Sequence, residues 1–404
     1  MRRTGPWTRC PAGAEDTGPV IDPAPPPLAS AALAAFLADT ERPTPYLVLD
    51  PGVVADRYVE VTAAFPDAGV LYAVKACPEP AVLRRLAGLG SGFDVASPAE
   101  VRLCLEAGAD PAVLCYGNPA RSRADVAAAH AAGVRRFVTD SRGDLADLIA
   151  NAPDSSVLVR VLVDDSGSAT PFFGKFGAAE AEAVELLRGA RAAGLRAEGV
   201  AFHVGSQQVR PGTYRDAVRQ ALRVAGAAGV RRAVLDVGGG FPVAYRSPVL
   251  PPAAFGAAVR EAVEGAVRAG MVDAVRLLCE PGRVLVAEAG VLRTRVLRAS
   301  WRPGVDHRRW VYLDAGRYQG LAETENEAIA YPLRVPGRAG PSGPVVLAGP
   351  TCDGDDVLYR RTPYMLPLAL RAGDAVDILH AGAYTSSYSS VGFNGFGPLA
   401  VHVL

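Results

Sequence analysis

The sequence predicts an eight-stranded parallel α/β barrel followed by a second, mostly antiparallel β domain. Two observations lead to this fold class. Short apolar runs alternate with Ala- and Leu-rich helical segments over a little more than 200 residues, and the alternation stops near residue 283. Half of the 404 residues are hydrophobic, so the chain can bury a large core over two to three domains.

The chain begins with residues 1–28, which are rich in Pro, Gly and Thr and have no apolar periodicity. This composition predicts a disordered leader, and it lacks the apolar run of a secretory signal. Residues 29–40 predict a helix and residues 45–49 a short strand. We expect the segment 29–49 to join the second domain.

Residues 50–283 are expected to form the barrel, because strand-like and helix-like segments alternate regularly there. One helix is expected to begin at Ser97, with Pro98 in its first position and Glu100 completing a capping box. The expected strands are 70–74, 92–95, 113–116, 136–139, 157–163, 200–204, 233–237 and 275–279.

Several of the helices between these strands are followed by glycine. Glycine readily adopts the left-handed conformation that closes a helix, so each of these positions predicts a helix end. These glycines are Gly90, Gly108, Gly133, Gly194, Gly229 and Gly270.

Residues 284–404 are expected to form the β domain. Apolar and polar residues alternate in short runs separated by Pro and Gly turns, which is the pattern of antiparallel strands with one buried face. The clearest runs are 291–297, 310–313, 345–347 and 375–378.

The overall charge argues against nucleic-acid or membrane binding. Lys and Arg together number 42, as do Asp and Glu, so there is no positive field to hold a polyanion, and no apolar run approaches the length that crosses a bilayer. The six cysteines form no CxxC pair and no metal-ligand spacing. We therefore expect a small-molecule partner, no metal, and a reducing, cytoplasmic setting.

Lysine is rare in this chain, where only Lys75 and Lys175 occur against 40 arginines. Arginine stays protonated and cannot act as a neutral amine nucleophile, whereas a lysine can form an imine with an aldehyde. Lys75 directly follows the apolar run of the first predicted barrel strand. We therefore expect Lys75 to be a functional residue.

Polar residues follow most of the predicted strands. The carboxyl ends of barrel strands converge on one face, where barrel enzymes have their active sites. Any one of these residues could instead be a helix cap or a turn, but their convergence favours a site. They are Lys75, Asp94, Asn118, Asp140, Arg160, His203, the glycines 238–240, Glu280 and Arg283.

These residue types suit an aldehyde cofactor with a pyridine ring and a phosphate. The Gly-rich turn 238–240, with Ser206, can offer backbone amides to a phosphate. Glu280 could keep a pyridine nitrogen protonated, or could form a salt bridge with Arg283 instead. His203 could stack on the ring or be a core histidine.

Nine short strings resemble, in order, those of the fold-type III ornithine, lysine and diaminopimelate decarboxylases, whose barrel is of the alanine-racemase type. The resemblance covers about residues 45–404 and implies a pyridoxal 5′-phosphate cofactor. The strings are YAVKA (72–76), FDVAS (93–97), KFG (175–177), FHVGSQ (202–207), LDVGGGFP (235–242), EPGR (280–283), GPTCDGDDVL (349–358), GAYT (382–385) and FNGF (393–396).

The resemblance also implies roles for individual residues. Lys75 would form the imine, His203 would stack on the cofactor ring, and Glu280 would pair with its nitrogen. Further cofactor contacts are implied for Asp94, Arg160, Ser206, Gly239, Gly240, Arg283 and Tyr384.

In this family two subunits share each active site, so the resemblance implies a homodimer. Cys352 would then donate a proton to the substrate Cα in the partner subunit's site, where Asp353 would face the distal group of the substrate. Phe393 is expected to line the substrate site.

The substrate is expected to be a basic amino acid, because Asp353 favours a cationic tail. The chain departs from the family at a second substrate-binding position. Where the eukaryotic ornithine enzymes have a Tyr-Asp pair, counting from Asp314, Gly316 and Tyr318 places Asn326 and Glu327, and Glu323 or Glu325 could replace Glu327. Ornithine and lysine differ by one methylene, worth about 1–3 kcal/mol, so the sequence does not separate them.

The same residues leave other functions open. The substrate could be diaminopimelate or another diamino acid of a specialised pathway. A non-catalytic protein resembling antizyme inhibitor would have lost cofactor or donor groups, yet Lys75, Glu280 and Cys352 are all present. An alanine-racemase-like enzyme fits the second-domain strings less well. A Schiff-base aldolase would show no visible absorption band without substrate.

Overall fold

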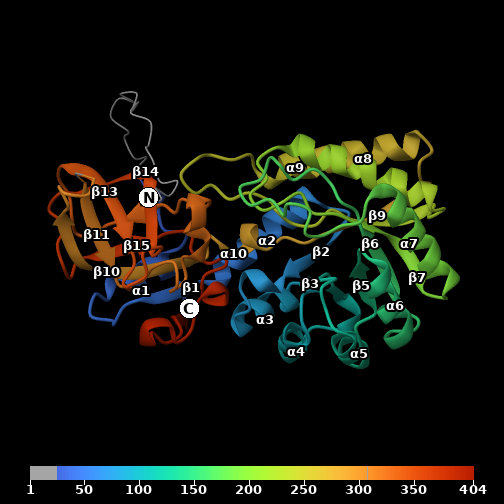
Figure 1. Ribbon diagram of the computed structural model, residues 1–404, viewed down its shortest axis with the longest axis horizontal. Helices are drawn as coiled ribbons and strands as arrows, with labels where there is room; N and C mark the ends of the chain where they lie inside the picture. Colours follow the sequence, from blue (N-terminus) through green and yellow to red (C-terminus); the bar gives the residue numbers. More distant parts are fainter. Residues whose placement is uncertain (1–24, 307) are drawn as a thin grey trace, which may run out of the picture.

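The computed structural model describes residues 25–306 and 308–404, and the expected leader therefore falls largely outside the described residues. Eight parallel strands close into a barrel, which confirms the predicted fold class (Figure 1). The strands are β2 (Ala68–Ala73), β3 (Gly92–Val95), β4 (Leu114–Tyr116), β5 (Arg136–Thr139), β6 (Ser156–Arg160), β7 (Arg196–Ala201), β8 (Arg232–Asp236) and β9 (Ala274–Cys279).

Closure of the barrel comes from the pairing of its first and last strands, in which Val70 of β2 lies opposite Cys279 of β9. The outward faces of the strands pack against a ring of helices in one large hydrophobic core. The helices are α2 (Pro51–Ala64), α3 (Pro80–Gly88), α4 (Pro98–Glu106), α5 (Arg123–Ala131), α6 (Arg142–Asn151), α7 (Glu180–Ala192), α8 (Pro211–Ala227) and α9 (Pro252–Arg268).

Helix ends follow the sequence signals. All six glycines expected to close helices have positive φ values, between 71° and 97°. At the start of α4, the Ser97 hydroxyl accepts a hydrogen bond from Glu100 N at 3.2 Å. The Glu100 carboxylate accepts from Ala96 N at 2.6 Å, one residue before the position that a standard capping box uses.

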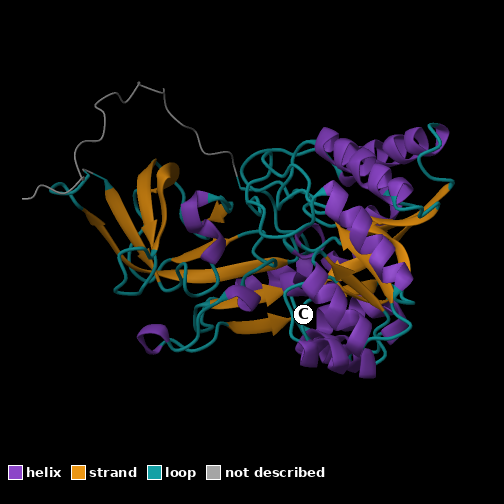
Figure 2. Ribbon diagram, turned by 45° about the vertical axis from the view of Figure 1, so that its right-hand side comes forward, coloured by secondary structure: helices purple, strands orange, loops and turns teal. Residues whose placement is uncertain are grey.

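The second group of strands forms one eight-stranded sheet beside the barrel, in the order β12–β15–β10–β11–β13–β14, with β1 paired to β10 and β16 paired to β1 (Figures 1 and 2). Most pairings are antiparallel, as expected. The strands are β1 (Tyr46–Leu49), β10 (Gly290–Trp301), β11 (Arg309–Leu313), β12 (Leu333–Arg334), β13 (Ser342–Ala348), β14 (Val357–Pro367), β15 (Ala375–Ile378) and β16 (Ala400–Val403).

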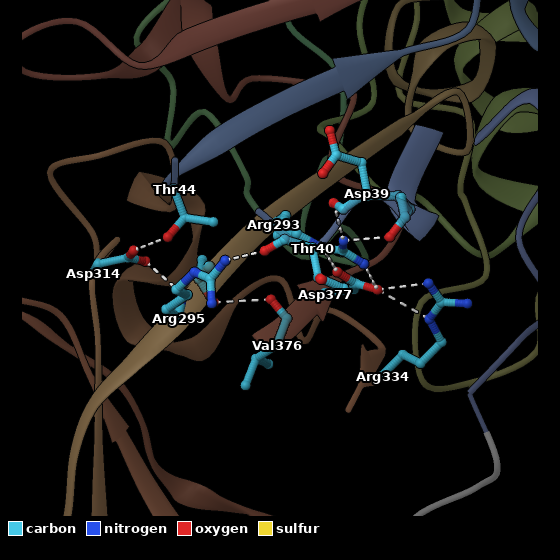
Figure 3. Close-up of polar contacts among 11 residues, drawn as sticks. Asp39, Thr40, Thr44, Arg293, Arg295, Asp314, Arg334, Val376 and Asp377 are labelled. Carbon is cyan, nitrogen blue, oxygen red and sulfur yellow. Dashed lines mark hydrogen bonds and ion pairs between the residues drawn. The ribbon is translucent and has the colours of Figure 1, made fainter. Parts of the chain in front are cut away.

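The segment before the barrel lies on this sheet. Helix α1 (Ala31–Ala38) precedes β1, which pairs antiparallel with β10 and parallel with β16. Arg293 of β10 binds the Asp377 carboxylate through its Nε at 2.7 Å and also donates to the Leu37 carbonyl, so one buried guanidinium joins the helix end to the sheet (Figure 3). Arg334 binds the same carboxylate at 2.6 Å.

Short segments connect the two parts close to the barrel mouth. After β9, the short helix α10 (Arg283–Val286) leads into β10. The loop after β15 returns to the barrel, where Tyr384 N donates to the carbonyl of Ala76 at 2.8 Å. Residues of the β domain therefore reach the carboxyl edge of β2.

None of the helices found in residues 25–306 and 308–404 combines the length and the apolar character needed to cross a bilayer.

Candidate active site

Lys75 lies at the barrel mouth, in the 3-10 turn Val74–Ala76 that directly follows β2. Its Nζ is 2.9 Å from Oδ2 of Asp94, which lies on the neighbouring strand β3. Burial alone would lower the pKa of Lys75, but Asp94, together with Tyr384 and Glu280, raises it above its ordinary value. The side chain is nevertheless 46% exposed, so the amine is accessible from the mouth.

Three carboxylates lie close together near this amine: Asp94, Asp236 at the end of β8, and Glu280 after β9. Gly117 makes room for two of them, because a Cβ there would lie 2.1 Å from Asp94 Oδ1 and 3.5 Å from Glu280 Oε1. Burial, then repulsion by Asp236 and Asp94, raises the pKa of Glu280. Burial also raises the pKa of Asp236, to about 6.

Asp94 Oδ1 and Asp236 Oδ2 are buried and find no hydrogen-bond partner within the described part of the chain. Buried acceptors are costly when unpaired, and such groups occur where a ligand or a proton completes the site. A protonated ring nitrogen could donate a hydrogen bond to one of these carboxylate oxygens.

His203 follows β7 and is held as a neutral ring. Its Nδ1 accepts a hydrogen bond from Gly205 N at 3.1 Å, and burial lowers its pKa, with further lowering by Arg160 and Lys75. The ring of Phe172 packs edge-on against it, with centroids 4.9 Å apart. A neutral, fixed imidazole can cover one face of a flat cofactor ring.

The turn after β8 is built from glycines because other backbones approach it closely. Gly238 and Gly240 have φ values of 64° and 89°. A Cβ on Gly240 would lie 2.1 Å from the Gly205 carbonyl oxygen, and one on Gly239 would lie 2.4 Å from that of Glu280. Only glycine fits this turn, which lies beside His203 and can present backbone amides to an anion.

Arg283 begins α10 and is only 4% exposed. Its Nη2 donates to Ser206 Oγ at 3.1 Å and its Nη1 to Tyr245 Oη at 2.9 Å. Both nitrogens also donate to Glu323, at 2.5 and 2.7 Å. Arg283 is therefore paired with Glu323, and the alternative salt bridge between Glu280 and Arg283 is not formed.

Two further predicted residues border this cluster. Arg160, the last residue of β6, lies over the rings of Phe172 and Phe176, with its Cζ 5.0 Å from each centroid. The ring of Tyr384 lies 5.0 Å from Cζ of Arg283, and Tyr384 has a φ of 53°. The structure thus brings both residues to the barrel mouth.

Asn118 and Asp140, which were grouped with the other strand-end residues, organise loops. The Asn118 side chain accepts from Ala120 N at 3.0 Å, and Asp140 Oδ2 accepts from Gly177 N at 2.9 Å. At these two positions the side chains stabilise loops, as the alternative of a cap or turn residue predicts.

Cys352, Asp353 and Phe393 form a separate group on the β domain. Cys352 is exposed, and its N donates to Asn394 Oδ1 at 3.1 Å. The ring of Phe393 lies 4.7 Å from that of Tyr318. Within the described chain, no hydrogen bond or ion pair joins this group to Lys75.

Glu327 lies at the end of the 3-10 segment η3 (Ala322–Glu327), with its carboxylate turned to β14. It accepts backbone hydrogen bonds from Arg360 and Arg361 at 2.9 and 2.7 Å, and from Thr362 at 2.6 Å. Asn326 has a φ of 52°, and its carbonyl accepts from Arg361 Nη2 at 2.7 Å. These contacts give no support to the expectation that Asn326 and Glu327 bind substrate.

The sequence did not predict the contacts that Asp236, Tyr245 and Glu323 make at this site. Asp236 precedes the glycine triplet at a strand end, so its position could have revealed it. Tyr245 and Glu323 lie in irregular segments with no periodicity, and only the fold brings them to Arg283.

Comparison with known proteins agrees with this geometry. Residues 52–287 match the model of the pyridoxal-binding domain of pyridoxal-dependent decarboxylases. A lysine/ornithine decarboxylase from Selenomonas ruminantium is 38% identical over 362 residues, covering 88% of each chain. A diaminopimelate decarboxylase from Actinosynnema pretiosum is 36% identical, covering 86% of this chain and 82% of the relative.

A solved structure of the lysine/ornithine decarboxylase from Vibrio vulnificus, complexed with cadaverine, superposes with a TM-score of 0.81. It is 32% identical and covers 93% of this chain and 99% of its own.

A barrel mouth with an accessible lysine, a buried acid cluster and a glycine turn beside a buried arginine defines an enzyme that uses an aldehyde cofactor with a ring and a phosphate. The chain belongs to the pyridoxal-dependent decarboxylase family. It is a decarboxylase, and its cofactor is pyridoxal 5′-phosphate.

Proposed function

We propose that this enzyme decarboxylates a basic L-amino acid, ornithine or lysine or both, to the corresponding diamine and carbon dioxide. One observation carries the proposal: the Lys75 amine lies accessible at the barrel mouth, 2.9 Å from Asp94 and beside the acid cluster. The relatives that act on lysine and ornithine support the choice of substrate.

The residues of the mouth divide the work. Lys75 binds the cofactor aldehyde and later releases the product. When bound, pyridoxal phosphate supplies a protonated ring that accepts the electron pair left as carbon dioxide departs. Glu280 keeps the proton on the ring nitrogen, and Asp94 and Arg160 support the ring and the acid cluster. His203 covers one face of the ring.

The phosphate is assigned to the glycine turn and the residues beside it. Backbone amides of the turn act as neutral donors, and Arg283 adds positive charge. The proposed ligands are Ser206, Gly239, Gly240, Arg283 and Tyr384.

We further propose a homodimer in which Cys352 and Asp353 serve the active site of the partner subunit. Cys352 then donates the proton that replaces the lost carboxylate at Cα. Asp353 pairs with the distal ammonium of the substrate by charge complementarity, and Phe393 lines its aliphatic part. The arrangement is supported by the lack of any hydrogen bond or ion pair between this group and Lys75 among the described residues.

We propose a cytoplasmic location. All five cysteines of the described residues are free thiols, which suits a reducing compartment.

The test of the function is release of carbon dioxide from single amino acids. Wild-type protein with pyridoxal phosphate should act on L-ornithine or L-lysine, and Lys75→Ala protein should not. D-ornithine, D-lysine, arginine and meso-diaminopimelate complete the panel. Preference for diaminopimelate, or no turnover of any basic amino acid, would reject the proposed substrate.

A further inference from the structure

Glu323 lies in η3 of the β domain, yet its carboxylate enters the barrel mouth and meets Arg283. The contact is a two-point pair, with Oε2 at 2.7 Å from Nη1 and Oε1 at 2.5 Å from Nη2. The exposed fractions of the two side chains are 11% for Glu323 and 4% for Arg283. A pair this buried is weakly screened by water, so its charges act strongly on each other and on neighbouring anions.

The donors of Arg283 can be accounted for one by one. A guanidinium has five N–H groups, two on each terminal nitrogen and one on Nε. Nη1 donates to Glu323 and Tyr245, and Nη2 donates to Glu323 and Ser206. Nε is buried and has no partner among the described residues. One N–H therefore remains for a ligand.

The turn that carries Glu323 is held firmly. The carbonyl of Glu323 accepts a hydrogen bond from Ile329 N at 3.1 Å. Asn326 and Glu327 both adopt left-handed backbone conformations, which reverse the chain between the two acids. Three backbone amides of β14 bind the Glu327 carboxylate, so this end of η3 is fixed to the sheet.

We propose that Glu323 is a positioning and charge-balancing residue for the cofactor phosphate. It fixes the Arg283 fork and cancels much of its charge, so that Arg283 offers the phosphate one N–H rather than a two-point contact. The remaining phosphate contacts come from neutral donors. This inference rests on the proposed phosphate site and concerns how tightly that site holds its anion.

The consequence of removing the acid follows from electrostatics. Without the carboxylate, Arg283 is a buried cation with an open fork, and a fork of this geometry binds phosphate oxygens in pairs. Tyr245 and Ser206 still hold the guanidinium in place. The phosphate should therefore contribute more to cofactor binding in Glu323→Gln protein than in wild type.

The experiment compares pyridoxal phosphate with pyridoxal, which lacks the phosphate. For each full-length variant, the ratio of the two dissociation constants, measured by absorbance, isolates what the phosphate contributes. We expect Glu323→Gln to raise the ratio of the pyridoxal constant to the pyridoxal phosphate constant by about tenfold, since the charge removed lies against a buried ligand. Glu323→Asp retains the charge and should stay within about threefold of wild type.

The matched control is Glu325→Gln in the same turn, whose acid is 64% exposed and lies 3.6 Å from Arg317. This change should leave the ratio unaltered. In an Arg283→Gln background, Glu323→Gln should have no further effect on the ratio, because the acid acts through Arg283.

Three results would overturn the inference. The ratio could stay at its wild-type value in Glu323→Gln protein, or its change could persist in the Arg283→Gln background. Glu323→Gln could instead raise KM for diamino acids with no change in the ratio, which would make Glu323 a substrate ligand. Failure of the proposed function is separate, since wild-type protein would then release no carbon dioxide from any basic amino acid.

Discussion

At Lys75, two opposing effects set the protonation of the amine. Burial favours the neutral form, and the Asp94 carboxylate at 2.9 Å favours the ammonium. The effect of the carboxylate, together with that of Tyr384 and Glu280, is larger than the effect of burial, so the pKa of Lys75 lies above its ordinary value. Only a neutral amine attacks an aldehyde, so the proposed capture of the cofactor by Lys75 would proceed through a minor protonation state.

The rate of cofactor capture should therefore rise with pH, about tenfold per unit, until the pH approaches the Lys75 pKa. In Asp94→Asn protein the carboxylate is gone, so the pKa of Lys75 should fall by about 1–3 units and capture at a given pH should be about 10- to 1,000-fold faster. Stopped-flow absorbance of apoprotein mixed with pyridoxal phosphate measures this profile. Asp140→Asn removes a strand-end carboxylate that does not contact Lys75 and should keep the wild-type profile; equal profiles in all three proteins would contradict the account.

Within η3, Glu323 and Glu327 are four residues apart, and a turn between them directs their side chains to different partners. Counting along the sequence placed Glu327 at the substrate, but the left-handed residues Asn326 and Glu327 turn the chain. Glu323 therefore enters the barrel mouth and Glu327 faces β14. Sequence spacing alone does not contain this reversal, because non-glycine residues rarely adopt such a conformation.

Glu327 should stabilise the fold in its charged form. Backbone and side-chain donors of residues 360–362 offset the effect of burial and lower its pKa to about 2. Because the folded pKa lies below the ordinary value, the contribution is full above about pH 4.5 and is lost as the pH falls towards 2.

Glu327→Gln protein should be less stable at pH 7 by on the order of 1–3 kcal/mol. The difference in Tm from wild type should shrink as the pH falls from 5 to 3, because the acid takes up a proton in the unfolded chain near pH 4.5 but stays charged in the folded protein until about pH 2. Thermal melts across this range measure it, with Glu325→Gln as the exposed control. A difference that is constant with pH would show that the charge of Glu327 is not what stabilises the turn.

Most barrel strands could be placed from the sequence, because a buried parallel strand is a short apolar run bounded by a helix end. Strand β6 ends at Arg160, three residues before its apolar run does, since the chain leaves the barrel there for the loop at the mouth. In the β domain, β14 was missed. It carries the arginines 360 and 361 and two prolines, which break the alternation that identifies a strand.

The site residues that directly follow barrel strands could be predicted, since barrel topology alone brings those positions together. Lys75, Asp94, His203 and Glu280 lie where this reasoning placed them. Contacts between the domains could not be predicted in this way, because they depend on how irregular segments such as η3 fold back onto the barrel.

At the scale of the whole molecule, the proposed functional residues fall into two groups, which no hydrogen bond or ion pair of the described residues joins. Lys75 and its neighbours lie at the barrel mouth, and Cys352 and Asp353 lie on the β domain with Tyr318 and Phe393. In a two-fold dimer the β-domain group of one subunit can reach the barrel mouth of its partner. Two-fold symmetry then makes the same contact a second time, with the two subunits exchanged.

Complementation tests this arrangement. Lys75→Ala and Cys352→Ala proteins should each be nearly inactive, and an equal mixture after subunit exchange should regain activity. Random mixing makes half of the dimers mixed, each with one intact site of two, so about a quarter of wild-type activity is expected. Mass spectrometry of labelled subunits verifies the exchange. Exchange without recovery of activity would place both groups in one chain's site.

We propose that Lys75 carries pyridoxal phosphate through a carbon–nitrogen double bond. Holoprotein should show a visible absorption band that borohydride abolishes, and peptide mapping by mass spectrometry should then find the reduced cofactor on Lys75. A colourless protein after incubation with pyridoxal phosphate, or a label on Lys175, would contradict the account.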